Sequence, residues 1–135
     1  MNILIIDGQG GQLGSGLIRS ILNRFNNVMI HAVGTNATAT AAMLKAGAAQ
    51  GATGENPVLV ACRKADIIIG PIGIVIADAL FGEITPKMAT AVAQADAVRI
   101  LLPSDKCDTF IAGVGSTGMS ALVEDAMDKL ASLLK

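Results

Sequence analysis

The first sixteen residues constrain the fold of this chain more than any other segment. Residues 3–6 are four consecutive aliphatic side chains (ILII), which indicates a short strand buried on both faces. Glycines then follow at the spacing G-x-x-G-x-x-G, and from residue 17 apolar side chains recur at the spacing of a one-faced helix. A strand, a glycine turn and a helix in this order predict the opening of a βαβ unit, and therefore a parallel sheet.

The rest of the chain continues this alternation. Short apolar runs predict further strands at residues 28–33, 66–70 and 98–102, with a weaker signal near 48–52. The residues are 52% hydrophobic, yet only three are Phe and none is Trp or Tyr, so the expected core is aliphatic, as a sheet covered by helices on both faces requires. Helices are predicted at about residues 13–25, 36–45, 57–64, 74–81, 86–97 and 119–134.

A sixth apolar segment, residues 109–112, carries a topological prediction. The link from the strand at 98–102 is too short for a parallel crossover, which needs about a dozen residues or more. We therefore expect 109–112 to form an antiparallel C-terminal strand. The predicted fold is a single Rossmann-like domain over residues 1–135, a three-layer α/β sandwich whose mainly parallel sheet has about five or six strands.

The first glycine loop is the main candidate for a binding site. Glycines in such a loop let the chain turn tightly and let a phosphate approach backbone N–H groups, and the helix N-terminus adds about half a positive charge. The alternative is a loop in which the glycines only make a tight turn. On the first hypothesis, the binding residues are those of the loop and of the turns after the second and fourth strands: Asp7, Gly8, Gly10, Gly11, Gln12, Leu13, Gly14, Gly34, Thr35, Asn36, Gly70, Pro71 and Ile72.

A second glycine segment, residues 113–118 (GVGSTG), matches the fingerprint G-x-G-x-x-G letter for letter. If 109–112 is antiparallel, this segment leaves the sheet at the edge opposite the first loop, away from the carboxyl ends where such folds bind ligands. We therefore expect it to be a structural turn capped by Ser116 or Thr117, the alternative being an anion site in its own right.

The first loop resembles the cofactor loop of the extended short-chain dehydrogenases, through Gly8, Gly11 and Gly14 with Gln12 and Leu13 before the last glycine. Those enzymes bind NAD or NADP in a Rossmann fold, so the resemblance, over about the first thirty residues, implies NAD(P) or another nucleotide as cofactor. They also use a catalytic Tyr-x-x-x-Lys. This chain has no tyrosine, so their chemistry does not carry over.

Over its full length the chain is similar to a family of small bacterial proteins described as a domain of unknown function. The stretches that carry this similarity are IIDGQGGQLG, GATGEN, DIIIGPIGIVIADALFGEITP and ILLPSDKC. The similarity implies a compact Rossmann-like domain and gives no activity.

Two features depart from a dinucleotide site. The second strand is followed by Gly34-Thr35-Asn36, where NAD enzymes place an acid for the ribose and NADP enzymes an arginine, so NAD, NADP and a mononucleotide all stay open. Asp7 precedes the first glycine, where it would repel a bare pyrophosphate but tolerate one that carries Mg²⁺. Its alternative role is to brace the loop through backbone N–H groups.

Catalytic residues are not defined by the sequence. His31 lies inside a predicted strand, and Cys107 is flanked by acids that disfavour a thiolate. If the protein is an enzyme, its acid or base is a carboxylate such as Asp7 or Asp78, although Asp78 fits a solvated helix position equally well. No set of residues has the spacing of metal ligands, so we expect no metal site.

Composition narrows the class of partner. A net charge of −1 without a basic cluster, and the scarcity of aromatic residues, argue against nucleic acid. No apolar run approaches the ~20 residues of a membrane span, and two distant cysteines indicate a reducing, cytoplasmic compartment. We expect a soluble protein that binds a phosphorylated small molecule, a nucleotide or NAD(P). The alternative is a ligand-free homo-oligomeric accessory protein, suggested by the alanine-rich helix and the apolar surplus.

Overall fold

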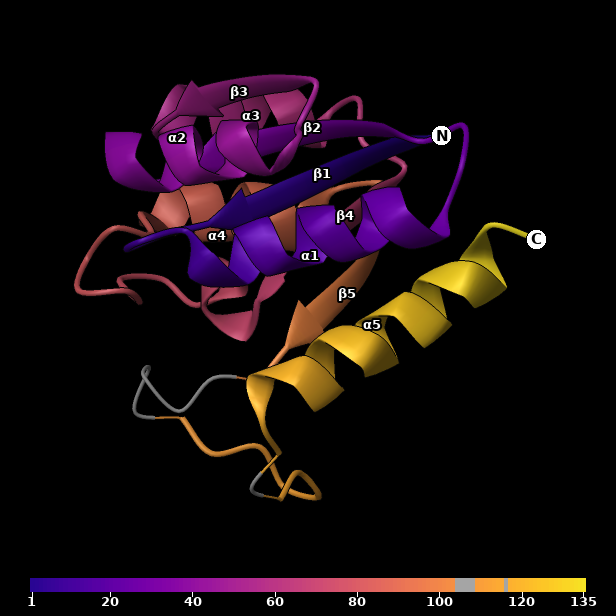
Figure 1. Cartoon of the computed structure of the whole chain (residues 1–135). Coiled ribbons are helices and arrows are strands. Elements are labelled where there is room, and N and C mark those ends of the chain that lie inside the picture. Colours follow the sequence, from indigo (N-terminus) through magenta and orange to yellow (C-terminus); the bar gives the residue numbers. More distant parts are fainter. Residues whose placement is uncertain (104–108, 116) are drawn as a thin grey trace.

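The computed structural model describes residues 1–103, 109–115 and 117–135. Its centre is a five-stranded sheet with the order β3-β2-β1-β4-β5, in which every described pairing is parallel (Figure 1). This is the order of the first five strands in a doubly wound dinucleotide-binding fold. The strands are β1 (Asn2–Asp7), β2 (Met29–Gly34), β3 (Gln50–Thr53), β4 (Ile67–Pro71) and β5 (Val98–Leu102).

Five α-helices and one 3-10 helix accompany the strands in the described chain. They are α1 (Gln12–Arg24), α2 (Ala37–Ala46), α3 (Glu55–Cys62), η1 (Ile72–Val75), α4 (Pro86–Gln94) and α5 (Met119–Leu133). The helix predicted at 74–81 is wrong, because the 3-10 turn ends at Val75 and three of the residues after it have a positive φ. No helix of the described residues is long and apolar enough to cross a membrane.

Two cores lie on the two faces of the sheet. Successive strand residues point to opposite faces, so Ile3 and Ile5 pack against α1, α2 and α5, while Leu4 and Ile6 pack against α3 and α4 (Figure 1). All four of these β1 side chains are at most 2% exposed. Burial on both faces is the reason why β1 is a continuous apolar run instead of an alternating one.

The predicted antiparallel strand is absent. Residues 109–112 form no strand, and β5 ends the described sheet, paired in parallel with β4. The short link to residues 98–102 requires an antiparallel arrangement only if 109–112 is a strand that pairs with β5. Here the segment follows the carboxyl end of β5 and pairs with none of the described strands. The chain returns as α5, in which Ala126, Met127 and Leu130 cover the β5 residues Ile100 and Leu102.

The close contact between β1 and β4 gives a prediction for stability. A Cβ on Gly70 would lie 2.4 Å from the carbonyl oxygen of Ile6, a backbone atom that has little room to move. Gly70→Ala should therefore lower the free energy of unfolding by about 1–3 kcal/mol in urea denaturation, as overpacked cores do. Gly16→Ala is the control, since a Cβ there meets nothing within 4 Å and should stabilise α1 by about 0.5–1 kcal/mol. Equal stability of Gly70→Ala and wild type would contradict this packing.

Candidate functional site

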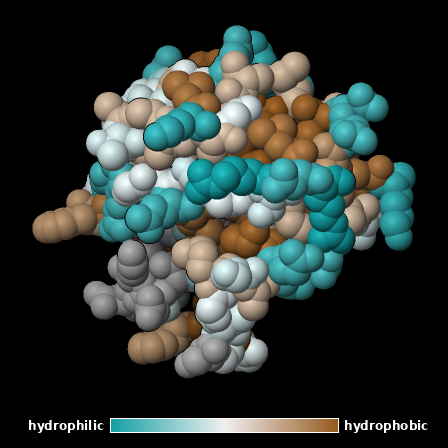
Figure 2. Space-filling view, in the orientation of Figure 1, coloured by the Kyte–Doolittle hydropathy of each residue, from teal (hydrophilic) through white to brown (hydrophobic). Residues whose placement is uncertain are grey.

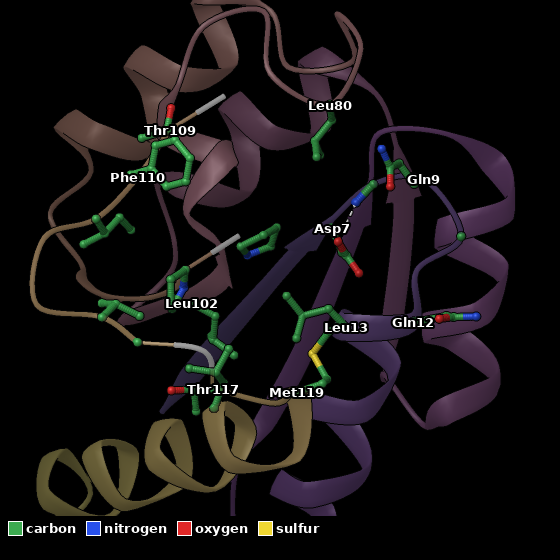
Figure 3. Close-up of a pocket in the computed structure, with 18 of the residues that line it drawn as sticks. Asp7, Gln9, Gln12, Leu13, Leu80, Leu102, Thr109, Phe110, Thr117 and Met119 are labelled. Atoms are coloured by element: carbon green, nitrogen blue, oxygen red, sulfur yellow. Dashed lines mark hydrogen bonds between the residues drawn. The ribbon is translucent and has the colours of Figure 1, made fainter. Parts of the chain in front are cut away.

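A pocket of about 980 Å³ lies at the carboxyl edge of the sheet, where β1, β4 and β5 end. Connections from β1 and β4 leave on opposite faces of the sheet, and in such folds ligands bind in the crevice that forms between these strands. Figure 3 shows Asp7 and Leu13 on one side of the pocket, Leu80 above them, Met119 below Leu13, and Phe110 on the opposite side. The volume is within the usual range for small-molecule sites, about 300–1,000 Å³.

The lining is mostly apolar away from the glycine loop. Asp7 is the one ionisable side chain among the described lining residues, and no Lys or Arg is found there. The donors that this described lining offers to an anion are backbone N–H groups and uncharged side chains such as Gln12 and Thr117. The apolar wall is made of Pro71, Leu80, Leu102, Pro103, Phe110, Ile111, Val114, Met119 and Leu122.

The buried Asp7 carboxylate holds the two ends of the glycine loop together through hydrogen bonds to its backbone. Its Oδ1 accepts a hydrogen bond from the Gly8 N–H at 2.8 Å, and its Oδ2 accepts one from the Gly14 N–H at 2.7 Å. The side chain is buried, with 6% of Asp7 exposed. Gly11 precedes α1 with a φ of 75°, a conformation that favours glycine, and its N–H donates to the Gly8 carbonyl. The carboxylate and the glycines together fix the turn from β1 into α1.

Three other backbone N–H groups of the loop have no hydrogen-bond acceptor among the described residues. Within the described chain, no acceptor is found for the N–H groups of Gly10, Gln12 and Leu13, all of which line the pocket. Unpaired donors at the start of a helix are suited to an anion. Gly10 is also open to solvent, since a Cβ there would meet nothing within 4 Å.

Glu83 was not predicted from the sequence, yet it joins three loops of this edge. Its Oε1 accepts hydrogen bonds from the Gln9 N–H at 3.0 Å and the Thr35 hydroxyl at 2.8 Å, and its Oε2 accepts one from Asn36 Nδ2 at 2.8 Å. Burial raises the pKa of Glu83, but these three hydrogen bonds together outweigh it and hold the pKa below its usual value. The only local signal was Gly82, which marks a turn.

The structure divides the sequence-predicted residues into two groups. Those that line the pocket are Asp7, Gly8, Gly10, Gly11, Gln12, Leu13 and Pro71, and those that do not are Gly14, Gly34, Thr35, Asn36, Gly70 and Ile72. Three glycines of the second group allow close packing instead. A Cβ would come within 2.5 Å of Met43 at Gly14, of Thr40 at Gly34 and of the Ile6 carbonyl at Gly70.

The second glycine segment lies at the same edge as the first loop, against expectation. Gly113, Val114, Gly115 and Thr117 line the pocket opposite the first loop. The expected position at the opposite edge depended on an antiparallel strand at 109–112, which does not exist. Because β5 is parallel to β4, the chain after it leaves at the carboxyl edge.

Two of the remaining candidates for chemistry, Asp78 and His31, do not line this pocket. Asp78 lies in a turn with a φ of 66°, and its N–H donates to the Ile84 carbonyl at 2.7 Å. His31 is half-buried in β2. Cys107 and Ser116 lie outside the described residues. Within the described ranges, no three or more His, Cys, Asp or Glu side chains gather into a group that could hold a metal ion.

The lowered pKa of Glu83 gives a prediction for stability against pH. The stability that its ionised form contributes is present above the unfolded pKa of about 4.3 and is lost as pH falls through the lower folded pKa. Glu83→Gln is close in size and does not ionise. The difference in unfolding free energy between wild type and Glu83→Gln, measured in urea, should be largest above about pH 5 and shrink toward pH 3. A difference that stays constant over this range would contradict the hydrogen-bonded carboxylate.

Comparisons with known proteins add a family and one described structural similarity. A family model described as "Domain of unknown function (DUF3842)" matches residues 2–135. No curated protein matches the chain. Matching solved structures include a dodecameric FMN-dependent UbiX-like decarboxylase from Escherichia coli O157:H7, with 17% identity and a TM-score of 0.46, over 96% of this chain and 76% of that chain. A similarity at this level says nothing of what the present chain binds. The likeness of the first loop to short-chain dehydrogenases stays a resemblance of that loop.

Proposed function

We propose, from the premise that the chain belongs to the DUF3842 family, a domain of unknown function, that it binds a phosphorylated small molecule of nucleotide type in the pocket at the carboxyl edge of its sheet. One observation carries the proposal. Both glycine segments of the sequence, residues 8–14 and 113–118, contribute to the lining of a single pocket of about 980 Å³ at the point where ligands bind in doubly wound sheets.

The phosphate end of the ligand would lie against the start of α1. The N–H groups of Gly10, Gln12 and Leu13 are available there, and the dipole of the 13-residue helix favours a negative charge at this end. Gly10 leaves space for phosphate oxygens to approach the backbone. These are the features that make strand-glycine-helix turns bind phosphate in other proteins.

The remainder of the ligand would contact the apolar wall. Leu102 and Phe110 lie across the pocket from the glycine loop (Figure 3), and together with Met119 they would cover a flat ring system. Pockets with a few convergent polar groups and a mostly apolar lining are typical of small-molecule sites.

The negative charge of Asp7 favours a phosphate that carries a bound cation. Its carboxylate lines the same pocket, so a phosphate that carries Mg²⁺ would meet less repulsion than a bare one. The two N–H groups that Asp7 accepts from partly offset its charge. Binding should therefore be measured with and without MgCl₂.

Gly10→Asp tests the proposed phosphate position. A thermal-shift panel of FMN, AMP, GMP and nicotinamide mononucleotide should raise the Tm of the wild type by several degrees for at least one compound, because a ligand at 100 times its Kd adds about 2.7 kcal/mol. The aspartate would place a carboxylate where the phosphate binds, so the shift should disappear. Gly16→Asp adds the same charge in α1, outside the pocket lining, and should keep it.

Two outcomes count against the proposal. One is a panel in which no compound changes the Tm of the wild-type protein. The other is a shift in Gly10→Asp as large as in the wild type and in Gly16→Asp.

A second candidate function is self-association, and two exposed aromatic side chains favour it. Phe81 is 95% exposed and Phe110 is 96% exposed, although the chain has only three phenylalanines. Figure 2 shows apolar side chains at the surface among hydrophilic ones. The alanine-rich helix supports this candidate only in part, since Ala89 is buried in the second core and Ala91 packs against it, whereas Ala93 is exposed.

Sizing in solution tests this second candidate. If the chain works as a homo-oligomer through these aromatic side chains, light scattering coupled to size exclusion should show a defined oligomer that Phe81→Ser or Phe110→Ser weakens by at least about tenfold in Kd, as removal of a central aromatic does. Met29→Ser is the control, because Met29 is also exposed but lies at the start of β2. A monodisperse monomer at micromolar concentration would exclude this candidate.

A further inference from the structure

The end of β2 differs from that of a dinucleotide site in a way that bears on ligand size. In doubly wound folds, a dinucleotide at the first glycine loop spans the crevice, and its adenosine ribose is held by a residue at the end of the second strand. In this chain the end of β2 leads into Thr35 and Asn36. Neither residue lines the pocket, which opens instead toward β4 and β5.

Glu83 occupies the space next to these two residues. Its carboxylate takes the Thr35 hydroxyl and the Asn36 amide as hydrogen-bond donors, both at 2.8 Å. Asn36 also donates to the Gln9 carbonyl at 2.9 Å and caps α2 by accepting from the Ala39 N–H. The polar side chains that could hold a ribose at the end of β2 are thus already engaged with one another.

The fit around the carboxylate is tight. A Cβ on Gly8 would lie 2.6 Å from the Thr35 hydroxyl oxygen and 2.8 Å from Glu83 Oε1. The first glycine loop, the end of β2 and Glu83 therefore contact one another with no room for a ligand group between them.

The backbone before Glu83 holds the side chain in this place. Asp78, Leu80 and Phe81 have φ values of 66°, 56° and 58°, a conformation that costs a non-glycine residue about 1–3 kcal/mol and is kept only where surrounding contacts require it. Those contacts are present, since Leu80 and Ile84 are buried in the second core and the Ile84 N–H donates to the Ala79 carbonyl at 3.1 Å.

We infer that Glu83 is a specificity-determining residue that closes the β1–β2 side of the crevice and so restricts the site to ligands with a single nucleotide unit. The inference rests on the proposed function and narrows its ligand class. One phosphate would lie at the α1 N-terminus and one ring against the apolar wall. The second nucleotide unit of NAD(P) or FAD would meet both the hydrogen-bonded Thr35-Asn36-Glu83 cluster and its negative charge.

Matched ligand pairs test this directly. FAD is FMN joined to AMP, and NAD⁺ is nicotinamide mononucleotide joined to AMP, so each pair differs only by the second unit. Calorimetric titration of the full chain should show that the mononucleotide of at least one pair binds at least about tenfold more tightly than its dinucleotide, a ratio that corresponds to about 1.4 kcal/mol. Glu83→Ala removes the carboxylate and should reduce that ratio to near one.

Two further variants separate the effect of the Glu83 side-chain volume from the effect of its charge and from a general loss of stability. Glu83→Gln fills nearly the same volume without the charge and should keep most of the preference for the mononucleotide. Glu55→Ala is the matched control, because the Glu55 carboxylate also accepts from a threonine hydroxyl, that of Thr85 at 2.7 Å, but lies outside the pocket lining. It should leave the ratio unchanged.

The outcomes distinguish this inference from the proposed function. Equal affinities of the wild type for both members of a pair would overturn the role of Glu83 and leave the proposed function intact, and this comparison does not need a stable variant. A preference that survives in folded Glu83→Ala would also overturn it. If no compound of either pair binds the wild type, the proposed function and the inference fail together.

Discussion

The arrangement of the carboxyl edge depends on the buried carboxylate of Asp7. By accepting hydrogen bonds from the N–H groups of Gly8 and Gly14, it ties the end of β1 to the first turn of α1 and fixes where that helix begins. The same two bonds remove two donors that a phosphate could otherwise use. What the loop can offer to a ligand is therefore the set of donors that Asp7 and Glu83 leave unused, at positions 10, 12 and 13.

Most of the fold was predictable because burial on both faces of a parallel sheet leaves a continuous apolar run for each central strand. The runs at β1 and β4 follow from this burial, whereas β5 is the edge strand of the described sheet, with Val98 and Arg99 exposed. The helices between the strands follow from their caps and their apolar faces. The same rule gave a wrong prediction for residues 109–112, an antiparallel strand. Its local pattern is that of a strand, but Phe110 is almost fully exposed and the segment pairs with none of the described strands, which no local pattern reveals.

The candidate site was predictable only in part. A strand, a glycine turn and a helix are adjacent in sequence, so the loop around Asp7 could be located. The cluster around Glu83 could not, because Glu83 lies 48 residues from Thr35 and 74 from Gln9. Its position also depends on left-handed backbone at Leu80 and Phe81, which are residue types that do not signal such a conformation.

The polar groups at this edge divide into a cluster that holds the loops together and a glycine loop that faces the pocket. On the β2 side, Glu83, Thr35 and Asn36 satisfy one another and hold the loops together. On the other side, the described pocket lining contains a single ionisable group, Asp7. Both oxygens of that carboxylate accept backbone hydrogen bonds, so the side chain holds the turn from β1 into α1. The turn fixed in this way leaves the N–H groups of Gly10, Gln12 and Leu13, which have no acceptor among the described residues, at the edge of the pocket.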